Sequence, residues 1–551
     1  MKLRARTSTI LCLLAAAITV AASAGASGPD RAAALCAREQ ALHVLNRLGF
    51  GPRPGDVERV LQMGVGKYID QQLDPEKIAD GAVAARLAAM PTLAMSNAEL
   101  FDKFERPMRE ARRQRKAEAG EGQDVDLEKL KAMIPPEKRP RRIIEELSVA
   151  RVIRAADSQR QLNEVMADFW MNHFNVFAAK GLDRVFLTSF ERDVVRPRIW
   201  GKFEDLLMAT AKSPAMLFYL DNARSVADEE HRSPEANRRA ALFGRREEKA
   251  PKGINENYAR ELMELHTLGV DGGYTQKDVT QLARVLTGWS IGQGGRRFGR
   301  GEGAGEFVFR AAMHDVGSKT VLGVTLPSGG GIEEGEKMIR FLALQPATAR
   351  HIAYQLCQRL VADDPPQALV DRVAKTFLAS AGDLRETVRA VVTSPEFSDP
   401  KSYRAKVKSP FEYVVSAVRA MGGSTDGRAL ARQLAQMGEP LYLCQPPTGY
   451  SDRADAWVNS GALIARLNFA LALAAGQLPG TSTEPQRLIS EAQAQSVDRS
   501  VDALARVLLG GGLSESTREA IRQRLATEQN AQAPVSLIAG LILGSPEFQR
   551  Q

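Results

Sequence analysis

Residues 255 to 269 read NENYARELMELHTLG, and this stretch shows the helical pattern that governs most of the chain. Asn255 can accept hydrogen bonds from the first backbone amides of a helix, and Gly269 can end one. We therefore predict a helix from Glu256 to Leu268. Its apolar residues cover more than half of the circumference, whereas a surface helix keeps a broader polar side, so we expect it to be buried.

The polar residues of this predicted helix divide between two faces. At about 100° per residue, Asn257, Glu261 and Glu264 lie on one face and His266 on the opposite one. A metal chelate built within this helix alone is therefore excluded. Arg260 stands four residues before Glu264, a spacing that favours an ion pair.

Helix signals recur along the whole chain. Ser-Pro pairs repeatedly open segments, because serine caps free backbone amides and proline suits the first helical position. SPFEYVVSAVRAMGG (409–423) adds Glu412 three residues after Ser409, which is a capping box. The pairs are Ser213-Pro214, Ser394-Pro395, Ser409-Pro410 and Ser545-Pro546. The chain is predicted to be mainly α, with one large multi-helix body.

One interruption is predicted in the middle of the chain. A glycine-rich loop leads into EFVFR and KTVLGVTL, which favour short strands. We predict a β-hairpin-like excursion around residues 305–326. The glycine-rich loop has no strand before it and no helix after it, so it does not predict phosphate binding.

The first residues resemble a secretory signal peptide. Lys2, Arg4 and Arg6 form a basic start, residues 10–20 are mostly apolar, and Ala22-Ser23-Ala24 offers a cleavage site. The apolar run is too short to span a bilayer, which takes about 20 residues. We expect an exported protein, periplasmic or secreted, with no transmembrane segment after cleavage.

The remaining organisation is predicted from changes in composition. Residues 1–24 form the signal peptide, residues 25–224 an N-terminal helical region, and residues 225–253 a charged surface insertion. Residues 254–551 form a central and C-terminal helical region that contains the β excursion. We expect the two helical regions to form one continuous body.

Charge and cysteine content exclude several classes of protein. The basic run REARRQRK (109–116) has no interleaved aromatic residues and is followed by acidic residues, so nucleic-acid binding is not expected. Cys36, Cys357 and Cys444 remain after cleavage and lack CxxC spacing, which excludes a zinc knuckle. They form either one disulfide with one thiol left over, or three buried free thiols.

A second polar motif is LNEVMADFWMNHFNVF (162–177). On a helix, Glu164, Asp168, Asn172 and Asn175 make one polar stripe, and His173 lies on the opposite face. If His173 packs against the Asn257/Glu261/Glu264 face, the two helices form a buried cluster of imidazole, carboxylates and amide.

Such a cluster has two alternative roles. Its pKa values would suit acid–base chemistry, or it would serve as a structural polar network. The predicted catalytic residues are His173, Glu261, Glu264, Asn257 and Asp168. We expect the carboxylate face of residues 256–268 to turn towards His173 rather than towards water.

Other polar and aromatic residues are candidates for ligand contact. His314 and Asp315 precede KTVLG in a loop or strand edge, where side chains can reach a cleft. The predicted ligand-binding residues are Trp170, Trp289, His314, Asp315 and Asp221, with burial in the core or stabilisation of a turn as their alternative roles. His173, His266 and His314 are the candidate metal ligands, and the sequence names no cofactor.

Several segments together resemble the domain of unknown function 1800 (DUF1800) family of exported bacterial proteins. They are HVLNRLGFGPRPGDV (from His43), DFWMNHFNVF (from Asp168), MLFYLDN (from Met216), GINENYARELMELHTLGVDGGYTQKDVTQLARVLTGW (from Gly253), HDVGSKTVLG (from His314), ARHIAYQLCQRLV (from Ala349) and QPPTGYSDRADAWVNSGALIARLNF (from Gln445). The family usually has Gly-Trp where this chain has Gly449-Tyr450. The resemblance implies export and a mostly helical body, but no established reaction.

The function expected from these observations is that of an exported envelope enzyme. It would use carboxylate and histidine acid–base chemistry to hydrolyse an extracellular polymer. The alternatives are a non-catalytic binding or assembly protein, with an envelope protein or polymer as its partner, and a metal-binding protein. No GxSxG, HExxH or P-loop pattern occurs, so serine hydrolase, zincin and nucleotide chemistry are not predicted.

Overall fold

The computed structural model describes residues 34–119, 133–233, 253–292, 303–526 and 535–551. These residues form many helices and only two-stranded sheets, so the predicted mainly α fold is confirmed. The predicted signal peptide and most of the predicted charged insertion lie outside the described residues. Within the described residues, no helix combines the length and apolar composition needed to cross a membrane.

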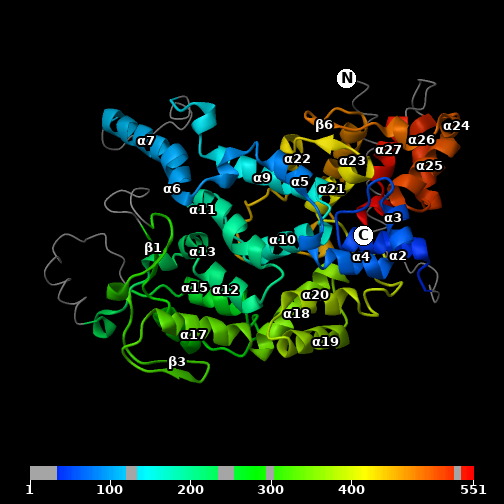
Figure 1. Cartoon of the computed structure of the whole chain (residues 1–551). Coiled ribbons are helices and arrows are strands. Elements are labelled where there is room, and N and C mark those ends of the chain that lie inside the picture. Colours follow the sequence, from blue (N-terminus) through cyan, green and yellow to red (C-terminus); the bar gives the residue numbers. More distant parts are fainter. Residues whose placement is uncertain (1–33, 120–132, 234–252, 293–302, 527–534) are drawn as a thin grey trace.

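The helices before residue 225 build the upper and central parts of the molecule in Figure 1. They are α2 (Ala37–Arg47), α3 (Asp56–Met63), α4 (Val65–Gln72), α5 (Gly81–Leu87), α6 (Asn97–Leu100), α7 (Arg106–Ala119), α9 (Arg141–Asp157), α10 (Gln161–His173), α11 (Asp183–Ser189), α12 (Phe203–Ala211) and α13 (Pro214–Tyr219).

The helices after residue 253 continue along the lower edge and return to the upper right of the same view. They are α15 (Asn257–Glu264), α16 (Gln276–Val285), α17 (Ile332–Ala343), α18 (Pro346–Leu360), α19 (Gln367–Ala379), α20 (Leu384–Val392), α21 (Pro410–Ala420), α22 (Arg428–Gln436), α23 (Ser460–Ala474), α24 (Glu491–Ala494), α25 (Val497–Leu509), α26 (Glu515–Ala526), α27 (Val535–Leu543) and α28 (Pro546–Gln549).

The strands form three antiparallel pairs. β1 (Trp289–Ile291) pairs with β2 (Phe307–Phe309), β3 (Lys319–Val321) with β4 (Val324–Leu326), and β5 (Ser424–Thr425) with β6 (Thr481–Ser482). The predicted β excursion is therefore confirmed. The structure adds β1, which lies shortly after α16 and outside the predicted range. Leu322 and Gly323 both have positive φ, as the two-residue turn between β3 and β4 requires.

The predicted caps begin three of the four expected helices. Ser213 accepts a hydrogen bond from Ala215, and Ser545 begins α28 in the same way. Ser409 and Glu412 form the predicted capping box of α21. Ser394 is different: its hydroxyl accepts the Phe397 amide, but the chain then continues through turns and not a helix.

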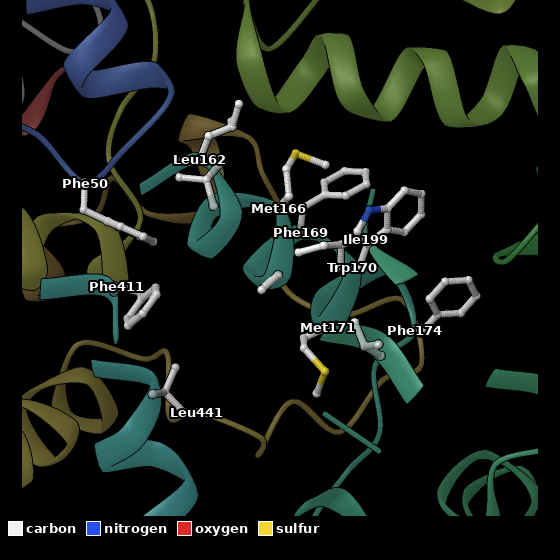
Figure 2. Packing of buried hydrophobic residues seen from close by; sticks show 14 of the residues in the cluster. Phe50, Leu162, Met166, Phe169, Trp170, Met171, Phe174, Ile199, Phe411 and Leu441 are labelled. Carbon is white, nitrogen blue, oxygen red and sulfur yellow. The ribbon is translucent and has the colours of Figure 1, made fainter. Parts of the chain in front are cut away.

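The centre of the fold is the contact of α10 with its neighbours (Figure 1). A single hydrophobic cluster extends from α2 to α28, and every residue of α21 is buried. Figure 2 shows Leu162, Met166, Phe169 and Trp170 of α10 within this cluster, near Phe411 of α21. Since the apolar side of α10 is buried in this way, its polar stripe faces other buried elements and not bulk water.

The three described cysteines are unpaired, which decides between the two predicted alternatives. Cys36 is exposed, so the expectation that all three would be buried is wrong for that residue. Burial raises the pKa of the Cys357 thiol to about 12 and of the Cys444 thiol to about 11. Of the three described cysteines, only Cys36 is exposed and therefore accessible to a reagent.

We expect Ellman's reagent at pH 8 to label Cys36 of the folded protein at least about tenfold faster than the other two, because attack requires an accessible thiolate. Cys36→Ser should remove the fast phase, and unfolding in urea should expose the two slow thiols. Equal rates for three thiols in the folded protein would contradict this prediction.

Candidate functional site

The polar stripe of α10 meets two buried arginines. The Asp168 carboxylate pairs with Arg151 of α9, and its other oxygen lies 3.0 Å from Nη2 of Arg359 of α18. Glu164, one turn earlier on α10, pairs with Arg196 at 2.9 Å. The stripe predicted from the sequence is therefore a row of buried, charge-paired groups.

Arg359 is the centre of this ionic network. Its guanidinium also contacts Glu412 of α21 at 3.1 Å and Asp452 at 2.8 Å, and the residue is only 7% exposed. Burial acts to lower the pKa of Arg359, but the carboxylates of Glu412, Asp452 and Asp168 outweigh it and raise that pKa. One cation thus holds together three carboxylates from different parts of the chain.

Arg151 is fixed by aromatic rings as well as by charge. Its guanidinium carbon lies 5.3 Å from the ring centres of both Phe411 and Tyr442. The Tyr442 hydroxyl donates a short hydrogen bond to Glu191, a buried carboxylate that also lies 2.7 Å from Arg196. These contacts leave Arg151 little freedom to move away from Asp168.

The side-chain amides of the stripe fix the loop that follows α22. Asn172 accepts the Tyr450 amide at 2.7 Å and donates to the Tyr450 carbonyl at 2.8 Å. Asn175 donates to the carbonyls of Cys444 and Pro446. Gly449 has φ 71°, and a Cβ there would lie 2.5 Å from the Asn172 carbonyl oxygen, so this close approach requires glycine.

Together these groups enclose a polar pocket with a cavity volume of about 30 Å³. Such a volume is large enough for a water molecule held by polar partners. The pocket reaches the surface at Ser451, which is exposed. Its lining residues are Arg151, Asp168, Met171, Asn172, Asn175, Val176, Arg359, Ser409, Glu439, Leu441, Tyr442, Tyr450, Ser451 and Asp452.

Glu439 is the second acidic group of chemical interest in this pocket. It is 7% exposed and accepts the Phe411 amide at 2.7 Å. Burial, followed by the negative charge of Asp168, raises the pKa of Glu439 to about 8. Glu439 has no ion pair with Lys or Arg among the described residues to oppose this rise in pKa, which favours the protonated carboxyl group.

Sequence reasoning missed Glu439, Arg151 and Arg359, although weak signals were present. Glu439 stands in the short apolar segment 437–443, and Arg151 interrupts the apolar run 147–156. A charged residue inside an apolar run is a candidate for a buried, paired group. The sequence alone gives no sign that these residues lie near Asp168, because they belong to other elements of the structure.

His173 does not approach the carboxylates as predicted. Its Nδ1 lies 2.9 Å from Oε1 of Gln355, and its Nε2 lies 3.3 Å from the His266 carbonyl oxygen. The ring centres of His266 and His351 are 6.0 and 6.3 Å from that of His173. The expected imidazole–carboxylate cluster is therefore wrong, because the opposite, His266-bearing side of the segment faces α10.

The helix expected over residues 256–268 is also shorter than predicted. α15 ends at Glu264, and Gly269 follows a turn with φ 83°. Arg260 pairs with Glu256 at 3.6 Å and not with Glu264, which instead accepts the Tyr274 hydroxyl. Asn255 accepts the Asn257 amide at 2.9 Å, but the residue at the N-cap is Glu256, which makes no side-chain capping hydrogen bond, so the predicted cap lies one residue too early.

The carboxylate face of α15 is turned partly to solvent. Asn257 is exposed, whereas Glu261 and Glu264 are half-buried. Burial and then the neighbouring Glu264 raise the pKa of Glu261. These three predicted catalytic residues form a group apart from Asp168.

The predicted ligand-binding residues are mostly inside the protein. Trp170 and Trp289 are fully buried, and His314 and Asp315 are equally inaccessible. Asp315 pairs with Arg284 at 2.8 Å and accepts the Gly317 amide at 2.9 Å, which is the turn-stabilising role considered as its alternative. Asp221 is the exception, an exposed residue paired with Lys180.

The three candidate metal ligands do not form one site. The ring centres of His173 and His266 lie 6.0 Å apart, whereas His314 lies elsewhere, 3.3 Å from Glu334 and hydrogen-bonded to the Thr287 carbonyl. Within the described ranges, no group of three or more His, Cys, Asp or Glu side chains could hold a metal ion.

Comparison with known proteins gives one match. The profile of a family described as "Protein of unknown function (DUF1800)" matches residues 43–550. No curated protein and no solved structure matches the chain. The matched range includes α10, the His266 turn, α18 and the whole Asp168 pocket. The chain therefore belongs to the DUF1800 family.

Proposed function

We propose that this chain is an exported hydrolase whose acid–base site is the Asp168 pocket. The observation that carries the proposal is that Asp168 and Glu439 line one enclosed polar pocket in contrasting environments. Two guanidinium groups contact Asp168. Glu439 has no such contact and keeps its proton. Two carboxyl groups with divergent environments are the usual arrangement for a general acid and a general base.

The catalytic roles of the two carboxyl groups follow from these different surroundings. Glu439 donates a proton to the leaving atom of the substrate, and Asp168 accepts a proton from the attacking water. Arg151 and Arg359 orient Asp168 and stabilise negative charge that develops in the pocket. The small cavity has room for a water molecule, so a polymer substrate would lie at its opening, against the loop that contains Tyr450 and Ser451.

The predicted export favours a polymer as the substrate class. The basic, apolar and small-residue segments at residues 1–24 resemble a secretory signal, and the polymers of the envelope lie beyond the inner membrane. We propose a periplasmic or secreted location and an envelope polymer as substrate.

A non-catalytic binding or assembly role is the second candidate. It is favoured by the small cavity and by the ion pairs of Arg359, which join α10, α18, α21 and the Asp452 loop. In that case the same charged residues would only hold the fold together, and the partner would bind elsewhere.

We expect Glu439→Gln to lower polymer hydrolysis about 10²- to 10⁴-fold, because the variant cannot donate the proton. The assay measures labelled fragments released from a panel of purified envelope polymers, with circular dichroism to confirm folding. Glu484→Gln, an exposed glutamate on a distant loop, is the matched control and should keep full activity.

Folded Glu439→Gln with wild-type turnover would refute the assignment of the acid. Wild-type protein that binds a polymer from the panel but releases no fragments would support the binding role instead.

A further inference from the structure

Two polar contacts join α10 to α18 at successive positions along the helices. Asp168 pairs with Arg359 at 3.0 Å, and five residues further along α10 His173 contacts Gln355 at 2.9 Å. Arg359 and Gln355 are one helical turn apart on α18, so they share a face. A change at the histidine end of this contact therefore acts directly on the ion pair of the pocket.

At that end lie three imidazoles from three segments. His173 ends α10, His266 lies in the turn after α15, and His351 lies on α18 one turn before Gln355. His173 and His266 are buried, and His351 is half-buried. Their ring centres are 6.0 to 6.3 Å from that of His173.

The surroundings of this cluster do not stabilise protonation of all its imidazole rings. A protonated His173 could donate to Gln355 and to the His266 carbonyl, but Nε2 of His266 is buried with no hydrogen-bond partner among the described protein atoms. Burial, followed by the charge of His351, lowers the pKa of His266 to about 3. Burial and then the other two histidines lower the pKa of His173 as well.

Ionic groups on the three segments already have partners other than the histidines. On α10, Asp168 is held by two arginines. On α18, Arg350 pairs with Asp371 of α19. Before the turn, Glu264 accepts the Tyr274 hydroxyl. Around the rings themselves the neighbours are Phe169, Trp170 and Phe174, so nothing described there offsets a second positive charge.

We propose that His173, His266 and His351 form an acid-sensitive latch between α10 and α18. Protonation drives the two helices apart at this end and loosens the Asp168–Arg359 pair. The consequence for catalysis rests on the proposed function of the pocket, but the opening itself does not. An exported protein meets the pH of its medium, so the latch links the site to external acidity.

The direction follows from proton linkage. Opened histidines titrate near pH 6.5, whereas the packed ones bind protons only at lower pH, so the open form takes up protons below pH 6.5. Each participating histidine raises the ratio of open to closed molecules by up to about tenfold per pH unit. Two or three histidines together give about 10²- to 10³-fold per unit below pH 6.5. For His266 this range extends down to about pH 3.

Hydrogen–deuterium exchange of the full chain tests the latch without any substrate. We expect peptides from residues 161–173 and 346–360 to lose protection between pH 7 and 5, after correction for intrinsic exchange. His266→Phe keeps an aromatic ring that cannot take up a proton, and it should reduce the slope by about tenfold per pH unit. His43→Phe is the matched control, because His43 is also buried and neutral but packs against Phe397 away from α10.

Protection of these two segments that does not change with pH would overturn the latch, as would an unchanged slope in His266→Phe. If that variant does not fold, His351→Gln at the half-buried position gives the same comparison. Exchange that follows the prediction in a protein without hydrolytic activity would leave the latch standing and reject only the proposed function.

Discussion

Arg359→Gln is expected to lower the free energy of unfolding by about 3–5 kcal/mol. The wild-type guanidinium is 7% exposed and contacts Asp168, Glu412 and Asp452. Its removal leaves buried negative charges without their common cation, and a neutral amide compensates for little of that loss. Urea unfolding followed by circular dichroism at pH 7 measures the change.

The same helix offers the control for this experiment. Arg350 pairs with Asp371 at 3.4 Å, but its side chain is 68% exposed. Surface pairs of this kind contribute about 0–1 kcal/mol, so Arg350→Gln should leave stability nearly unchanged. Similar losses in the two variants would show that the burial of the Arg359 network has no special energetic role.

Asp183→Asn is expected to stabilise the protein at pH 8, by on the order of 4 kcal/mol. Asp183 is fully buried, and neither carboxylate oxygen has a hydrogen-bond partner among the described residues. Burial raises its pKa from 3.8 to about 9, with Lys180 partly opposing the shift and Asp221 adding to it. Asparagine has nearly the same shape and never ionises, so unfolding no longer gains a solvated carboxylate.

The effect of Asp183→Asn on the free energy of unfolding is expected to depend on pH. A raised folded-state pKa means that the contribution of Asp183 is fully present below pH 3.8 and is lost as pH rises towards 9. The gain from Asp183→Asn should therefore be small at pH 4 and grow to pH 8, as measured by urea unfolding at both values. The exposed Asp271→Asn is the control, and an equal gain at both pH values for Asp183→Asn would contradict the explanation.

The local predictions held where neighbouring residues contain all the necessary information. The capping box of Ser409 and Glu412 needs only four consecutive residues, and the β3–β4 turn needs only its own backbone angles. The polar stripe of α10 is a matter of helical spacing, so Asp168 was correctly placed among polar residues. Ser394 began no helix because the residues that follow it continue through turns.

The errors concern which face meets which partner. The spacing in NENYARELMELHTLG separates Glu261 from His266, but it cannot say which side packs against His173. The structure places the His266 side there, because that side also carries the apolar residues Leu262 and Met263, which are buried. Burial of aliphatic side chains is favourable, whereas burial of Glu261 and Glu264 without cations is not.

The amino-acid pattern alone predicts the helical class, the ends of many helices, the β excursion and the residues that share a helix face. These depend on backbone geometry and on contacts between residues close in the chain. The pairing of Asp168 with Arg151 and Arg359, the pocket that Asp168 shares with Glu439, and the three histidines between α10 and α18 became known only once the elements were placed in space. Those groups lie on different elements, and their protonation depends on burial and on neighbouring charges, which exist only once the chain has packed.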